Sequence, residues 1–346
     1  MTPTFCTYFT RILGLLAVCF AFNACTNNQT NSPDVSHIKV DLKVNRFEQE
    51  LFKADSSNYE AHFEKMAQKY PKFFNLYVQE IMEITSAKDT SNLSKKALWH
   101  FVSNANIKAL NDSCQLLYSN FETIGKEFEM AFKRYKYYFP NRKQIPEIFT
   151  HVSEFGPAAA TLDSSLIAVS LDMYLGKNFV YYPSLGIPNY VMKHLETPYI
   201  VPNSLKAFLT SLFGLTNKTN RLVDRMVYEG KILYVLDLLL PKVPNEIKMN
   251  YTKEQLNWCE QNENQIWRYF IDKDLLFSTK SREYMKLLTD GPTTTGMPTK
   301  SPGKVGAWVG WQIVKSYMKQ FPNTTMDDLM QLNDGQMVLT KSKYKP

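Results

Sequence analysis

Two carboxylates in the second half of the chain have the spacing of an acid and base pair. If their leucine-rich surroundings form a helix, Glu229 and Asp237 lie about two turns apart on roughly the same side. One carboxylic acid and one carboxylate so placed can donate and accept protons in catalysis. The alternative, which we favour, is that both form ion pairs with Lys231, Arg221 or Arg225 and seat the polar edge of a buried helix.

Histidines and cysteines give no sign of a metal site. A catalytic zinc ion needs about three protein ligands, and a helix supplies two of them as histidines four residues apart. No two histidines have this spacing; they are His37, His62, His100, His151 and His194. Cys114 and Cys259 follow no C-x-x-C pattern, so we expect two structural thiols, with one disulfide as the alternative. The sequence predicts no metal and no cofactor.

Two glycines lie in a helical window beside two tryptophans. Gly306 and Gly310 alternate with Trp308 and Trp311, and glycine inside a helix costs about 1 kcal/mol relative to alanine. We therefore expect something to approach this backbone closely, most simply another helix of the same domain. The alternative is a partner protein that docks there, because exposed tryptophan is a strong interface anchor.

The N-terminus has the layout of a secretory signal. Arg11 precedes an unbroken apolar run, Ile12 to Phe22, which is too short to span a membrane. The run closes with FNAC at 22–25, which resembles the lipobox of bacterial lipoprotein signals. We expect cleavage before Cys25 and a covalent lipid at Cys25 that anchors the protein to a membrane. An ordinary secretory signal with a chance cysteine is the alternative.

The remainder of the chain predicts one globular domain. Residues 1–24 form the expected signal peptide, 25–36 a polar flexible tether, and 37–346 the domain. Removing Arg11 with the signal lowers the formal charge from +7 to +6. A hydrophobic content of 44% with 14% aromatic residues excludes disorder.

Hydrophobic patterns predict an α+β fold that is predominantly α-helical with a small sheet. Apolar and polar residues alternate over His37 to Val44, which predicts a strand with His37 facing solvent. Ser165 to Leu171 predicts a second strand, which Ile145 to Val152 could pair with. The region from Phe47 to Phe139 is mostly helical in pattern.

Two helix starts are marked more sharply. Thr252 with Gln255 forms a capping-box pattern, and Ser301 with Pro302 suits an N-cap and first turn of a helix that runs to Tyr317. Basic and aromatic residues interleave at 133–143, a pattern that suggests nucleic acid in a cytoplasmic protein. A lipid anchor excludes nucleic acid, so we expect a solvated basic face, with anionic lipid or acidic glycan as permitted ligands.

Several long phrases carry a family resemblance. They are RMVYEGKILYVLDLLLP at 225–241, NENQIWRYFIDKDLLFST at 262–279, DGP at 290–292, SPGKVGAWVGWQIVKSYM at 301–318 and SKYKP at 342–346. Together they resemble the gliding-motility lipoprotein family GldB of Bacteroidetes. The resemblance implies a cell-envelope lipoprotein needed for gliding and for the associated type IX secretion, with other envelope proteins as partners.

A fainter resemblance concerns mechanism. A strand at 165–172, a helix, and then a helix that contains Glu229-Gly230 resemble zinc peptidases in which a Glu-Gly helix supplies the third ligand. The preceding helix should hold H-E-x-x-H, yet residues 198–213 contain neither histidine nor carboxylate. The resemblance implies a degenerate metallopeptidase-like fold that has lost its metal.

These observations favour a periplasm-facing lipoprotein that binds other envelope components and is not an enzyme. Two other classes remain as alternatives. One is an envelope metallohydrolase or peptidase, and the other is a solute-binding lipoprotein, which should have two similar α/β lobes. Nothing in the sequence decides between inner and outer membrane.

Overall fold

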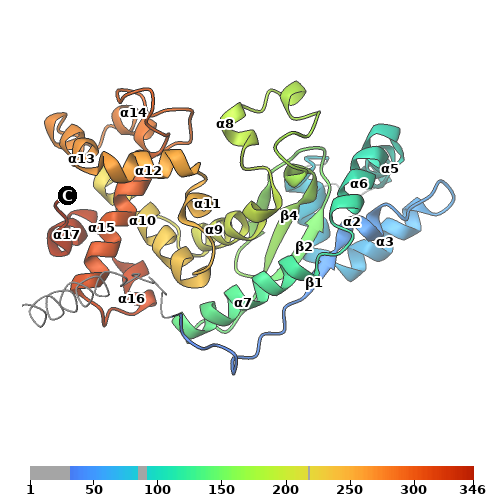
Figure 1. The fold of residues 1–346 in the computed structure, drawn as a ribbon. Coiled ribbons are helices and arrows are strands. Elements are labelled where there is room, and N and C mark those ends of the chain that lie inside the picture. The colour runs from blue at the N-terminus through green and yellow to red at the C-terminus, as the bar shows by residue number, and fades with distance from the viewer. Residues whose placement is uncertain (1–31, 85–91, 217–218) are drawn as a thin grey trace, which may run out of the picture. The chain divides into compact units, whose positions relative to one another are not determined.

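The computed structural model describes residues 32–84, 92–216 and 219–346 (Figure 1). Within them, Asp34–Pro346 form one compact unit. The fold is α+β and predominantly α-helical, as predicted. The predicted signal peptide, Cys25 and most of the predicted tether lie outside the described residues.

A mixed sheet of four strands lies within this unit, in the order β1-β2-β4-β3. β1 (Val44–Arg46), β2 (Glu147–His151) and β4 (Leu166–Ser170) are parallel, and β3 (Ala159–Leu162) is antiparallel to β4. The predicted pairing of the segments Ile145 to Val152 and Ser165 to Leu171 is confirmed by the register of β2 and β4. Every residue of β4 is buried, as expected of a central strand covered on both faces.

The strand predicted at His37 to Val44 is wrong except at its last residue. Residues 38–44 do alternate between half-buried and exposed, and His37 is exposed. However, backbone pairing with β2 reaches only from Val44 to Arg46, apart from a bond between the amide of Ile148 and the carbonyl of Lys43. The alternation therefore reports packing against the domain, without a neighbouring strand to complete a ladder.

The sheet separates two apolar cores. Ile167 and Val169 of β4 belong to the larger core, which is built mainly by the helices after Glu122. Phe149 and Ala168 face a smaller core formed with helices of residues 47–102. Successive residues of a strand point to opposite faces, so each strand serves both cores.

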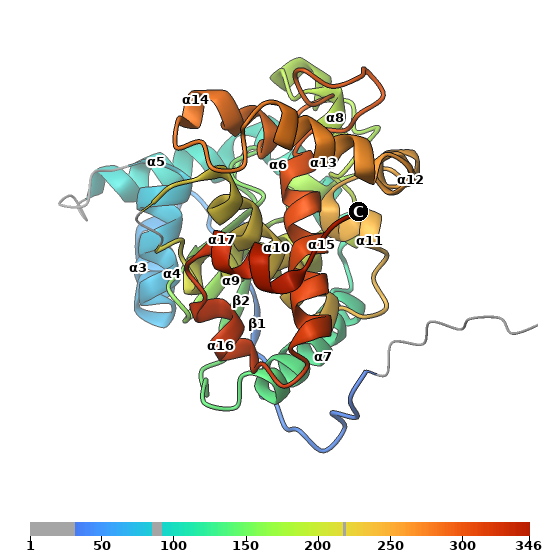
Figure 2. The same cartoon turned by 90° about the vertical axis from the view of Figure 1, so that its left-hand side faces the viewer.

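Two long helices cross within the larger core. α10 (Leu222–Leu239) packs against α15 (Val305–Gln320), and Figure 2 shows them side by side. α15 starts after the predicted Ser301 and Pro302, because Lys304 has a left-handed backbone with φ of 46°. The Ser301 hydroxyl instead accepts a hydrogen bond from the amide of Thr294.

The capping box at Thr252 is confirmed and opens α12 (Lys253–Gln261), which a break at Asn262 separates from α13 (Glu263–Asp272). The remaining α-helices are α2 (Phe47–Leu51), α3 (Tyr59–Lys69), α4 (Pro71–Leu76), α5 (Asn92–Ser103), α6 (Ala105–Leu117), α7 (Glu122–Tyr138), α8 (Asn189–Met192), α9 (Ile200–Leu212), α11 (Asn245–Met249), α14 (Ser281–Tyr284), α16 (Met326–Gln331) and α17 (Gly335–Ser342). Short 3-10 or π turns cover Tyr77–Ile81, Leu171–Tyr174, Pro183–Leu185, Thr197–Tyr199 and Met285–Leu287.

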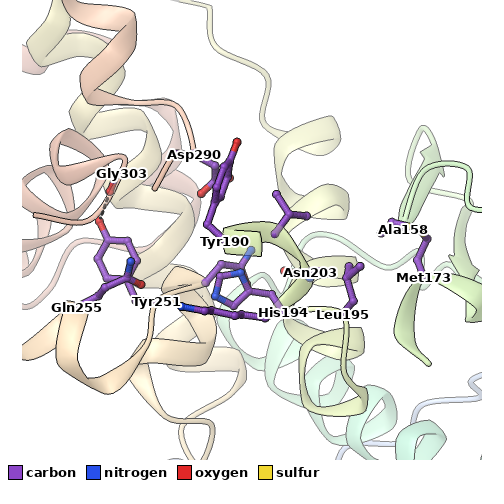
Figure 3. Close-up of a pocket in the computed structure, with 14 residues that line it drawn as sticks. Ala158, Met173, Tyr190, His194, Leu195, Asn203, Tyr251, Gln255, Asp290 and Gly303 are labelled. Atoms are coloured by element: carbon purple, nitrogen blue, oxygen red, sulfur yellow. Dashed lines mark hydrogen bonds between the residues drawn. The ribbon is translucent and has the colours of Figure 1, made fainter. Parts of the chain in front are cut away.

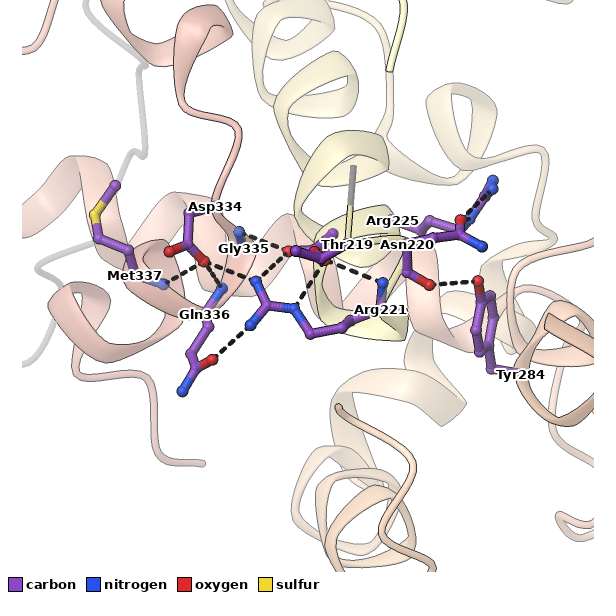
Figure 4. A network of polar contacts seen from close by, with 10 residues as sticks. Thr219, Asn220, Arg221, Arg225, Tyr284, Asp334, Gly335, Gln336 and Met337 are labelled. Carbon is purple, nitrogen blue, oxygen red and sulfur yellow. Dashed lines mark hydrogen bonds and ion pairs between the residues drawn. The ribbon is translucent and has the colours of Figure 1, made fainter. Parts of the chain in front are cut away.

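A polar network ties the start of α10 to α17 (Figure 4). Asp224 is buried and accepts hydrogen bonds from the Arg221 guanidinium at 3.0 Å and from the amide of Gly335 at 2.9 Å. Arg221 also pairs with Asp334. Burial alone would raise the pKa of Asp224, but the hydrogen bonds from Arg221 and Thr219 outweigh it and hold this pKa below its ordinary value.

We expect Asp224→Asn to destabilise the protein in a pH-dependent way. Because the folded pKa is depressed, the carboxylate stabilises the fold fully above about pH 4, and this contribution fades as pH falls through the folded pKa. The variant should lose about 1–3 kcal/mol of unfolding free energy at pH 7, and less at pH 3. Urea unfolding at both pH values measures this. A difference from wild type that stays constant with pH would contradict it.

Candidate functional site

Glu229 and Asp237 have separate ion-pair partners. Glu229 Oε2 lies 3.2 Å from the Nζ of Lys206 on α9. Asp237 pairs with Lys248 and accepts a hydrogen bond from the indole Nε1 of Trp311 at 2.9 Å. No interaction joins the two carboxylates to each other within the described part of the chain. Both therefore have the expected structural ion pairs, but with lysines from other helices.

The partners predicted for these carboxylates are wrong. Lys231 is buried and donates to the carbonyl oxygens of Met330 and Leu332, and burial lowers its pKa to about 8. Arg221 binds Asp224, and Arg225 binds the Asn220 side chain. The predicted partners were residues close to the carboxylates in sequence. The packed helices instead bring lysines from α9 and α11 to Glu229 and Asp237.

Gly306, Gly310 and their tryptophans pack inside the domain. A side chain on Gly310 would overlap the carbonyl of Met226 on α10, and one on Gly306 would come within 2.8 Å of the Leu287 carbonyl oxygen. Trp308 and Trp311 are only 2% and 1% exposed. In this conformation the close approach comes from the domain itself, and neither tryptophan is available to a partner.

Figure 3 shows residues that line a small cavity, here called the His194 cavity. Its volume is about 160 Å³, and its wall contains apolar, amide and charged side chains. The walls come from the loop before β3, the 3-10 turn after β4, α8 and the residues after it, α9, the segment before α12 and α12 itself, and the two ends of the loop 290–303. The lining residues include Tyr190, His194, Asn203, Asn250, Tyr251, Gln255 and Asp290.

An ion pair between a buried lysine and an exposed aspartate lies beside the cavity. Lys304, only 4% exposed, places its Nζ 2.6 Å from Oδ1 of Asp290, whose side chain is 59% exposed. Burial and the nearby charge of Lys206 lower the pKa of Lys304, and Asp290 opposes them. Gly303 touches Gly291 so closely that no side chain fits between them. The ends of the loop 290–303 are thereby fixed against each other.

Two polar atoms of the cavity residues have no partner. Nε2 of His194 and Oδ1 of Asn250 are buried without a hydrogen bond to any described residue. Burial, followed by the charge of Lys304, lowers the pKa of His194 to about 4, so its ring is neutral at neutral pH. A buried polar atom without a partner costs about 1–3 kcal/mol. Both residues line the cavity, but these two atoms have almost no accessible surface, so it is the mixed apolar and polar lining that makes the cavity the candidate binding site.

The other histidines and cysteines that could bind a metal do not form a cluster. His151 is fully buried beside the rings of Phe73 and Tyr77, and Cys114 and Cys259 are buried free thiols. In residues 32–84, 92–216 and 219–346, no three His, Cys, Asp or Glu side chains lie where they could share a metal ion.

Sequence reasoning missed the central pairs of this region. Asp290 and Lys304 stand in the DGP and SPGK phrases, but nothing in their spacing shows that they meet. Lys206 is the only charged residue of α9, and a lone cation on a largely buried helix is the one signal that could have pointed to an acidic partner.

A family model described as gliding motility protein GldB matches residues 28–346. The chain belongs to this family. GldB proteins are gliding-motility lipoproteins, which agrees with a membrane-associated envelope protein. Among the described residues, no helix is both long and apolar enough to cross a membrane. No curated protein and no solved structure matches the chain, so the resemblance of this GldB protein to zinc peptidases stays a prediction.

Proposed function

We propose that this GldB-family lipoprotein acts in gliding, and in the associated type IX secretion, by binding another component of the cell envelope rather than by catalysis. Acyl chains on Cys25 would hold it at a membrane, with the domain facing the periplasm. The His194 cavity is the binding site that the structure supports best, because its wall combines apolar, amide and charged side chains.

The observation that carries the proposal is the Lys206–Glu229 ion pair. Glu229 is the residue that a zinc-peptidase arrangement would use as a metal ligand. Its Oε2 lies 3.2 Å from a lysine ammonium, which would repel a metal cation bound at the same carboxylate. The pair therefore supports a structural role for Glu229 and argues against metal-assisted chemistry.

Metal analysis of the purified protein tests this proposal. We expect far less than one zinc ion per chain after dialysis against zinc, and an unfolding temperature that a chelator does not change, because folding would not depend on a metal. Glu229→Gln serves as the matched control, since it removes the candidate ligand. Stoichiometric zinc that is lost in Glu229→Gln would contradict a non-catalytic, metal-free role.

A further inference from the structure

We propose that the domain rests on an anionic phospholipid surface through one end, where α7, α10 and α15 terminate. This surface, here called the basal end, is formed by residues 133–143, 238–242 and 318–328. The inference rests on the proposed function in one respect, the lipid at Cys25. It goes beyond that function by naming the face of the domain that meets the bilayer.

The C-terminal ends of the three helices meet at the basal end. The Arg134 guanidinium on α7 donates to the carbonyl of Leu239, the last residue of α10, at 3.1 Å. Arg142, just after α7, pairs with Asp327 on α16. An open groove of about 780 Å³ is lined by residues from all four helices, among them Tyr137, Tyr138, Tyr234, Met318 and Met326. The basal end is therefore one continuous surface.

The chain enters the domain at this end. The carbonyl of Lys39 accepts a hydrogen bond from the Nζ of Lys136 near the end of α7, and the start of the described chain runs below α7 in Figure 1. Val35 is already buried. Asp34 is the ninth residue after Cys25, so the acyl chains lie within about 30 Å of it. A compact domain of this length is about 50 Å across, so the anchor favours contact between the bilayer and the basal end.

The basal end carries an excess of positive charge. Its three segments contain seven Lys or Arg residues and two Asp residues. These cations offset the partial negative charge of the carbonyl groups at the helix ends. Lys143 and Lys319 are exposed, and neither has an ion-pair partner in the described chain. An anionic membrane attracts such residues by roughly fivefold in affinity for each one near its surface.

Exposed aromatic rings at the basal end also suit a membrane interface. Tyr137 is 47% exposed and Phe321 is 39% exposed. The ring of Tyr137 packs edge-on against Tyr138, with centroids 5.0 Å apart, and the ring of Phe321 lies 4.8 Å from that of Tyr317. Tyrosine is enriched at the head-group level of membranes, and surfaces that bind membranes combine such apolar rings with lysine and arginine.

A second exposed apolar surface lies at the other end of the sheet. Val180, Tyr181 and Leu185 are exposed in the loop that follows the carboxyl end of β4. Because β1 and β4 are both parallel to β2, this loop and residues 34–43 lie at opposite edges of the sheet. Figure 1 accordingly shows α8, which follows the loop, at the top and α7 at the bottom. The loop and the α8 side of the His194 cavity would face away from the bilayer, where an envelope partner can reach them.

The test places a fluorescent probe on each surface of the mature, acylated protein in phospholipid vesicles. Tyr137→Cys, Phe321→Cys and Val180→Cys each introduce one reactive thiol, because the other mature thiols are buried or lipidated. The vesicles contain phosphatidylglycerol, phosphatidylcholine and phosphatidylcholine with a nitroxide on its head group, which quenches nearby probes. We expect quenching at Tyr137→Cys and Phe321→Cys to be several-fold stronger than at Val180→Cys.

Two charge variants in the Tyr137→Cys protein make the test specific. Lys143→Gln/Lys319→Gln should lower the ratio of docked to undocked domain, measured from the quenched fraction, by at least about fivefold. Vesicles without phosphatidylglycerol should have the same effect. Lys96→Gln/Lys108→Gln removes two exposed lysines from α5 and α6 and should leave the ratio unchanged. Thermal unfolding shows whether each variant is folded.

Three results with folded, acylated protein would overturn the inference. They are equal quenching at both surfaces, stronger quenching at Val180→Cys, and quenching at Tyr137→Cys that vesicles without phosphatidylglycerol retain in full. Mass spectrometry of the purified protein detects the acyl chains independently. Protein without acyl chains would overturn both the anchor in the proposed function and this inference, whereas acylated protein without quenching at the basal end would overturn this inference alone.

Discussion

Gly310→Leu should destabilise the protein more than any other single change in the crossing of α10 and α15. The backbone of α15 at Gly310 touches the Met226 carbonyl, and Gly230 on α10 touches the backbone of Gly310 in return. Even a methyl group has no room there, because the atoms in the way are backbone atoms of a packed helix. Overpacking of this kind costs about 1–3 kcal/mol and occasionally more, and we expect the upper end or beyond.

Substitutions at two other glycines allow the stability loss of Gly310→Leu to be compared. Gly306→Leu should cost less, because its closest obstacles are the Leu287 carbonyl of a short 3-10 turn and a movable Leu288 side chain. Gly214→Leu should be nearly neutral, since nothing lies within 4 Å of its side-chain position. Urea unfolding of the three purified variants ranks them. A Gly310→Leu protein of normal stability that abolishes gliding would mean that the glycine surface serves a partner instead.

Cys25→Ser should release the protein from the membrane. Each buried methylene of an acyl chain contributes about 0.8 kcal/mol to membrane binding, so several chains anchor durably and none leaves little affinity. The variant should accumulate as an unprocessed or soluble form and should not incorporate labelled fatty acid. Membrane fractionation with lipid labelling measures both effects.

Cys19→Ser is the matched control for this prediction. Cys19 lies in the apolar run ahead of the expected cleavage site, so its loss should leave processing and anchoring unchanged. Persistent membrane association with label still attached to Cys25→Ser protein would contradict the lipoprotein assignment.

Sequence patterns predicted those elements of the fold that depend on residues close together in the chain. The apolar run at Ser165 to Leu171 became β4, and the side chains of Thr252 and Gln255 formed their capping box. The strand at His37 to Val44 was mispredicted because alternation records which side chains are buried, whereas a strand also needs a partner. The start of α15 was mispredicted because the Ser301 hydroxyl bonds to Thr294 in its own loop.

The candidate site could not be predicted because its parts are distant in sequence. Lys206 meets Glu229, Lys304 meets Asp290, and His194 shares one cavity with Asn250. Each of these pairings depends on how helices pack, and sequence spacing carries no information about it. Glu229 and Asp237 do form ion pairs, as predicted, but the predicted partners were wrong for the same reason.

The basic and aromatic stretch at 133–143 was also misread in part. It was expected to be a solvated basic face, yet Lys133 pairs with Glu129, and Arg142 pairs with Asp327. Lys136 donates to the carbonyl of Lys39. The contacts of Arg142 and Lys136 reach other segments of the domain, whereas the Lys133–Glu129 pair lies within α7, so part of the apparent basic surface is used internally.

The most direct test of a non-catalytic role is to remove both charges of the Lys206–Glu229 pair at once. Lys206→Met/Glu229→Gln replaces the ion pair by groups of similar shape and leaves no buried charge unpaired, a change that is often close to neutral for stability. Cells whose only copy carries this double variant should accumulate normal amounts of protein and spread by gliding as wild-type cells do. Normal abundance and a normal unfolding curve without any gliding would show that the Glu229 carboxylate itself performs essential chemistry.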